Sequence, residues 1–207
     1  MQARIVPIFF LCFVVSNLAE ICIDGEHNAV TVENINEDLD IHLVDVKLAT
    51  YDKDDKPACK DGKPQMRFPG IVKLLNGSIR VKAANNLLSE RLSALFTIRK
   101  DSVVIGTVCE RGKSKIFFIP NRKCVANVTQ HLGPVILKTL EQPGTYDILE
   151  LASRTGFHTV VNVESPGRIV NAIISGGWKA EIKVLSGKRK TIANVKVPAN
   201  IEYVDVD

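Results

Sequence analysis

The tetrapeptide R-G-K-S at residues 111–114 has the residue types of a phosphate-binding loop, in which backbone amides and a lysine hold nucleotide phosphates. That motif also requires a glycine at position 107, where this chain has Thr107. Gly106 is one position off, and no helical pattern follows the serine. We therefore interpret the tetrapeptide as a chance match.

Other catalytic patterns are missing from the sequence. It contains no G-x-S-x-G nucleophile motif, and its four histidines, at 27, 42, 131 and 158, are scattered. A glycosidase carboxylate pair is defined by a distance in space, so the abundant acids do not identify one. No C-x-x-C pair occurs, and a zinc site is not expected. The sequence therefore predicts a protein that is not an enzyme and uses no cofactor or metal.

The N-terminus predicts a secreted protein. One basic residue precedes an apolar run at residues 5–15, which is too short to span a membrane and is typical of a secretory signal. The alternative is a buried N-terminal strand. We expect a signal peptide at 1–19 and a single domain at 20–207, secreted or delivered to a lysosome-like compartment. Sequons at Asn76 and Asn127 are then candidate glycosylation sites.

The cysteines indicate a disulfide framework. Removal of the signal takes Cys12 away and leaves four cysteines. An even number in an oxidising compartment predicts two disulfides, with three possible connectivities. We favour the short-range bridge Cys109–Cys124, which leaves Cys22 to pair with Cys59.

Charge is distributed unevenly along the chain. Residues 20–64 contain twelve acidic and five basic residues, whereas the chain from residue 65 onward contains eleven acidic and twenty-one basic residues. For a secreted protein, this basic part favours anionic lipid head groups or acidic glycans as partners, and not nucleic acid. The alternative is a solvated surface whose lysines protect the edges of strands.

Short strands separated by turn signals predict an all-β, two-sheet antiparallel sandwich. Alternating apolar residues indicate strands at 41–51, 71–83 and 92–99, and a further strand is expected at 115–119. A short helix or loop is expected at 124–142, where Gly133 and Pro134 exclude one long helix. Another strand should begin in P-G-T-Y-D-I-L-E-L, and one more in T-V-V-N-V-E.

The segment 178–197 predicts a hairpin with one apolar and one charged face. A two-residue turn at Ser186-Gly187 would set the register. The predicted pairs are Trp178 with Val195, Ala180 with Ala193, and Ile182 with Thr191.

The apolar interior is the feature that could carry function. Periodicity fits a sandwich filled with side chains as well as one that encloses a cavity. A cavity could take an acyl chain of about fifteen carbons, which at ~0.8 kcal/mol per buried CH₂ contributes roughly 10 kcal/mol before entropic costs.

Several segments, in order and spacing, resemble one family. They are P-G-I-V-K-L-L-N-G-S-I-R-V, E-R-L-S-A-L-F-T-I-R-K-D-S-V-V-I-G-T-V-C-E, E-Q-P-G-T-Y-D-I and G-G-W-K-A-E-I-K-V-L-S-G-K-R-K-T-I-A-N-V-K-V. Together they resemble the lysosomal ganglioside GM-two activator proteins of the MD-two-related lipid-recognition (ML) superfamily. The resemblance covers nearly the whole mature chain. The family has a cysteine in its C-terminal strand that this chain lacks, so Cys22 must pair otherwise.

The resemblance implies an immunoglobulin-like sandwich opened into an apolar cup. Such a cup would hold the acyl chains of a lipid or glycolipid, touch a membrane transiently and present the lipid to a soluble hydrolase. By position, Val103, Val104 and Ile105 match the family's membrane-dipping rim loop; the alternative is an ordinary hairpin packed on the core. The candidate cavity residues, each of which could instead be core, are Leu92, Ala94, Phe96, Ile98, Tyr146, Ile148, Trp178 and Ile182.

Two other classes of function remain open. The same sandwich could be an extracellular recognition or signalling module that binds a receptor or a glycan. A glycan-active hydrolase is the third class.

Overall fold

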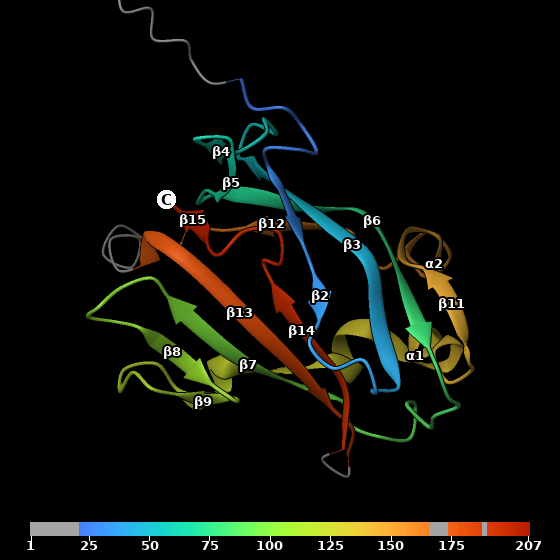
Figure 1. Cartoon of the computed structure of the whole chain (residues 1–207). Helices are drawn as coiled ribbons and strands as arrows, with labels where there is room; N and C mark the ends of the chain where they lie inside the picture. The colour runs from blue at the N-terminus through green and yellow to red at the C-terminus, as the bar shows by residue number, and fades with distance from the viewer. Residues whose placement is uncertain (1–20, 166–173, 188–189) are drawn as a thin grey trace, which may run out of the picture.

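The computed structural model describes residues 21–165, 174–187 and 190–207. The expected signal peptide lies outside these residues. Two β-sheets form separate layers, with α1, α2 and β11 gathered at one end and β8 and β9 at the other (Figure 1). Within the described part of the chain, no helix is long and apolar enough to cross a membrane.

The first sheet is built on two long strands, β3 (Ile41–Asp52) and β6 (Gly70–Val81), which pair antiparallel along most of their length. β1 (Ala29–Thr31) pairs with β3. β11 (Gly144–Asp147) and β12 (Val160–Val163) both pair with β6, at opposite ends of that strand. β-branched residues are frequent in β6, and they favour an extended, half-buried backbone.

The second sheet is centred on β13 (Gly176–Leu185) and β7 (Ser93–Lys100), which pair antiparallel. β14 pairs with β13 and β2, and β10 pairs with β7. Among the described strands, β5 and β15 form the one parallel pair. The other strands are β2 (Glu33–Asn34), β4 (Cys59–Lys60), β5 (Lys63–Met66), β8 (Thr107–Glu110), β9 (Lys113–Ser114), β10 (Val125–Asn127), β14 (Thr191–Val197) and β15 (Val204–Val206). The predicted all-β, two-sheet sandwich is confirmed.

Helical structure is limited to a 3-10 turn, Asn121–Cys124, and two short helices, α1 (Val128–Thr139) and α2 (Ile148–Thr155). α1 breaks at Gly133, whose φ is 73°. The strand expected after the Pro-Gly turn is β11, but it is short. It ends at Asp147, because the carboxylate of Asp147 accepts a hydrogen bond of 2.8 Å from the Glu150 amide and caps α2.

Two details of the sequence prediction are wrong. The β13–β14 loop is longer than a two-residue turn, so Ala193 lies opposite Val184 instead of Ala180, and Ile182 pairs with Val195. Because the displacement is four residues along β13, an even number, Ala193 and Val195 keep their predicted face. Thr191 does not, because an irregularity in the register places it opposite Leu185. The strand expected at 115–119 is also absent from this described stretch. The chain turns there, because the Ser114 hydroxyl bonds locally to the Ile116 backbone.

The hydrophobic core is densest at the helical end. Its buried members come from both sheets and both helices: Val81, Leu87, Leu92, Ile136, Leu137, Leu140, Leu151 and Ile192. A second cluster lies at the β8 end, where Val108 packs with the cystine Cys109–Cys124. The other disulfide joins Cys22 to Cys59, so both bridges follow the connectivity that the sequence favoured.

Candidate binding cavity

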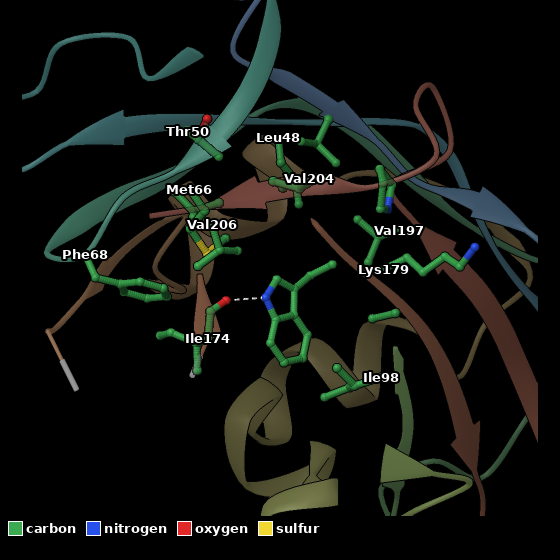
Figure 2. A pocket seen from close by; sticks show the side chains of 15 residues that line it. Leu48, Thr50, Met66, Phe68, Ile98, Ile174, Lys179, Val197, Val204 and Val206 are labelled. Carbon is green, nitrogen blue, oxygen red and sulfur yellow. Dashed lines mark hydrogen bonds between the residues drawn. The ribbon is translucent and has the colours of Figure 1, made fainter. Parts of the chain in front are cut away.

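A cavity of about 450 Å³ lies between the two sheets, separate from the filled core at the helical end. Figure 2 shows the fifteen side chains around it. The first sheet contributes Val30, Leu48, Thr50 and Val72. The second sheet and its neighbouring segments contribute Met66, Phe68, Ile98, Ile174, Trp178, Lys179, Ala180, Val197, Pro198, Val204 and Val206.

The polar groups of Trp178 and Thr50 in this lining are already hydrogen-bonded within the protein. The Trp178 indole N–H donates to the Ile174 carbonyl, so the ring forms part of the wall with its polar atom satisfied (Figure 2). The Thr50 hydroxyl is directed at the carbonyl oxygens of Ala58 and Asn28, 3.0 and 3.2 Å away. What remains for a ligand is a surface of hydrocarbon.

Lys179 is the charged residue in this lining, but its ammonium group points away from the cavity (Figure 2). The ammonium nitrogen lies 4.2 Å from the centre of the Tyr203 ring and 3.7 Å from the Glu202 carboxylate. Among the described residues of the lining, there is no carboxylate or imidazole that could transfer a proton. Across the described residues, no group of three potential metal ligands gathers.

A part-buried polar network adjoins the cavity wall next to Thr50. Asp24 accepts hydrogen bonds from the Tyr51 hydroxyl, at 2.8 Å, and from the Asn28 amide, at 3.1 Å. Burial, and then the bond to Asp24, raise the pKa of the Tyr51 phenol. The phenol therefore remains a neutral donor at physiological pH, and it ties the segment after Cys22 to β3.

Two of the residues proposed from the sequence, Ile98 and Trp178, line this cavity. The others lie elsewhere. Leu92 belongs to the filled core, and Tyr146 packs against it. Phe96 packs on the cluster around the Cys109–Cys124 cystine. Ala94, Ile148 and Ile182 are also outside the lining.

Most of the lining was not found from the sequence. Leu48 and Val72 belong to strands that the alternating pattern identified, and that pattern gave no reason to prefer them over their neighbours. Val204 and Val206 come from a three-residue strand. Met66 and Phe68 carried no recognisable signal in the sequence.

Four large apolar side chains are exposed together on the two loops that flank β8 and β9. Val103 and Val104 are 106% and 93% exposed, and Phe117 and Phe118 are 99% and 57% exposed. We call these four residues the apolar edge. Ile105, which the sequence grouped with the two valines, instead packs inward.

The apolar edge rests on a rigid base. Ile105 anchors the first loop, and Ile116 and Ile119 anchor the second, in one cluster around the Cys109–Cys124 cystine. Within the second loop, Phe117 and Phe118 pack edge to face with ring centres 5.3 Å apart. The four exposed side chains are therefore held out by packed neighbours.

The apolar edge adjoins one wall of the cavity, and the segment that carries it is rich in basic residues. Trp178 pairs with Lys100, immediately before the first loop, and the Asp101 amide donates to the Gly177 carbonyl at 2.8 Å. Residues 99–123 include seven basic and two acidic residues. Such a combination of exposed apolar side chains and flanking cations suits an anionic lipid surface.

Comparison with known proteins gives little further constraint. No protein-family model and no curated protein matches the sequence. Among solved structures, the fold is similar to that of chicken MD-1, crystallised in complex with lipid IVa. The two chains are 10% identical, with 81% of this chain and 95% of that chain covered, at a TM-score of 0.28. A TM-score this low decides neither family nor ligand.

Proposed function

We propose that this protein binds and carries a lipid, with the acyl chains held between the two sheets, and has no catalytic activity of its own. The single observation that carries the proposal is the cavity of about 450 Å³, lined almost entirely by hydrocarbon. An apolar cavity that is open to an amphiphile gains free energy by replacing water with acyl chain.

The size of the cavity suits one long acyl chain. If a methylene group occupies about the volume of a water molecule, ~30 Å³, the cavity holds roughly fifteen carbons. Burial of that chain contributes roughly 10 kcal/mol before the entropic cost of binding, at ~0.8 kcal/mol per CH₂. This gain is comparable to what the same chain has in a bilayer, so exchange between protein and membrane is feasible.

The finer parts of the proposal follow the resemblance in the sequence. We place the protein in the ML superfamily, as a secreted or lysosomal sphingolipid-activator-like carrier whose domain comprises residues 20–207. It would take a glycolipid from a membrane and present the head group to a soluble hydrolase. Asn76 and Asn127, the candidate glycosylation sites, are both exposed.

The direct test of lipid carriage is the content of protein purified from a eukaryotic secretion host. We expect a native mass spectrum to show the protein with a bound mass of several hundred daltons, and an organic extract to contain the corresponding lipid. An empty protein that also fails to take up lipid from vesicles would contradict the proposal.

We assign membrane contact to the apolar edge, and the variant Val103→Asp/Phe117→Asp tests this assignment. Full burial of a side chain of this size contributes about 1.5–3 kcal/mol, and an aspartate is repelled by anionic lipid. We expect at least a roughly tenfold loss of binding to anionic vesicles, measured by co-sedimentation.

The matched control places the same two charges on exposed valines outside the apolar edge, Val135 in α1 and Val161 in β12. The variant Val135→Asp/Val161→Asp should bind vesicles like the wild type. Equal losses in both variants would mean that net charge, and not insertion of the apolar edge, governs membrane binding.

A further inference from the structure

A second, smaller hollow of about 220 Å³ adjoins the cavity and has a different lining. It shares Lys179, Ala180, Val197 and Pro198 with the cavity. The remainder of its lining is mostly polar and charged: Ile35, Thr97, Arg99, Glu181 and Lys196. One molecule could therefore reach an apolar and a charged environment from the same place in the fold.

The strand pairing explains why the two hollows meet at Lys179. β13 pairs with β15 up to Trp178 and with β14 from Ala180 onward. At Lys179 one neighbouring strand has ended and the other has not begun, so the sheet is interrupted on that side. A head group attached to a chain in the cavity has its shortest route to the charged hollow at this interruption.

The charged hollow brings like charges together. Arg99 and Lys179 lie directly opposite each other on β7 and β13, and like charges in this position destabilise a sheet. The Lys179 ammonium is 3.7 Å from the exposed Glu202 carboxylate, and Lys196 is paired with the Glu33 carboxylate at 2.7 Å. Among the described residues that line the hollow, Glu181 supplies the carboxylate. The Arg99 guanidinium is thus the main group that an incoming anion would meet, with the Lys179 ammonium, already close to Glu202, as the second.

We propose that this hollow is the head-group subsite of the carried lipid and that it selects an oxyanion: phosphate, sulfate or carboxylate. This inference rests on the proposed lipid-carrier function and adds a ligand class to it. The Arg99 guanidinium would donate two hydrogen bonds to the oxyanion, and Lys179 would contribute a point charge. The acyl chain would enter the cavity past Ala180.

The test compares two amphiphiles that differ only in charge, a monoacylglycerol phosphate and the uncharged monoacylglycerol with the same chain, both below their micellar concentrations. Trp178 is the chain's one tryptophan and lines the cavity, so its fluorescence reports binding. We expect the phosphate-bearing amphiphile to bind roughly tenfold more tightly, as charge-assisted hydrogen bonds predict, and this ratio to fall as salt is added.

In the variant Arg99→Gln the ratio should fall towards one, while the affinity for the uncharged amphiphile stays unchanged, because Arg99 is not among the residues that line the cavity. The control Lys183→Gln removes the same net charge outside the hollow, and it should keep the wild-type ratio. A ratio near one in the wild type, or an unchanged ratio in the first variant, would overturn the head-group subsite. Neither result would contradict the lipid-carrier function.

Two further results separate the alternatives. If neither amphiphile changes the Trp178 fluorescence or co-elutes with the wild-type protein, the lipid-carrier function itself fails. Inorganic phosphate at the concentrations used for the amphiphiles should leave the binding ratio unchanged, because a free ion has no chain to hold it at the subsite. If inorganic phosphate abolishes the ratio, the hollow is a site for a free anion and the head-group assignment is wrong.

Discussion

Replacement of Ala180 by phenylalanine should weaken the binding of a long-chain amphiphile roughly 100-fold. Ala180 pairs with Ile98 on one side and Val197 on the other, and all three residues line the cavity. A benzyl group there would take space from the ligand. If it displaces about four methylene groups at ~0.8 kcal/mol each, the loss is ~3 kcal/mol, or about two orders of magnitude. Titration of Trp178 fluorescence measures the effect.

The control for this variant adds the same ring to the other face of the same strand. Lys183 lies an odd number of residues from Ala180 on β13, so its side chain points away from the cavity. Lys183→Phe should bind the amphiphile with wild-type affinity, and thermal unfolding should show that both variants are folded. Wild-type affinity in folded Ala180→Phe would mean that the chain binds somewhere else.

Removal of the Cys109–Cys124 bridge should lower the free energy of unfolding by about 3 kcal/mol, the value expected for a loop of this length, since the two cysteines are 15 residues apart. Such a loss is a large part of the stability of a typical domain. The variant Cys109→Ala/Cys124→Ala should also release the loops of the apolar edge, because their anchoring isoleucines pack around this cystine. Denaturant unfolding and vesicle co-sedimentation measure the two effects.

The second disulfide provides the comparison. Cys22→Ala/Cys59→Ala opens a longer loop, since these two cysteines are 37 residues apart, so the loss of this bridge should cost at least as much stability. Because this bridge lies outside the cluster that holds the apolar edge, vesicle binding by the folded fraction should persist. If both variants lose vesicle binding equally, the Cys109–Cys124 bridge has no special role in presenting the apolar edge.

The sequence predicted the two-sheet architecture better than it predicted which residues line the cavity and which belong to the filled core. Alternation over residues 92–99 predicted a common side for Leu92, Ala94, Phe96 and Ile98, because side chains in a strand repeat every two residues. The last three belong to β7, and Leu92 lies directly before it. Alternation contains no information about position along the strand. Leu92 therefore lies in the filled core and Ile98 lines the cavity, although the two residues share a pattern.

Similar reasons explain the other differences. The register of β13 and β14 depends on the length of their loop, which the Ser-Gly pair does not determine, so the face of Ala193 and Val195 was predicted correctly and their partners were not. The exposure of Phe117 and Phe118 depends on a local turn at Ser114 and on the packing of their neighbours around the Cys109–Cys124 disulfide. An apolar pair inside a predicted strand, here 115–119, gives no sign of that exposure in the sequence.

The most direct measurement of the central claim is quenching of Trp178 by acyl chains that carry a nitroxide at different carbons. Because the indole forms part of the cavity wall, bound chains should quench its fluorescence strongly, and a label in the chain should quench more than one on the head group. Ala180→Phe should reduce this quenching at a fixed lipid concentration. Binding of the same amphiphiles without quenching of Trp178 would show that the chain is not held between the sheets, and would contradict the account.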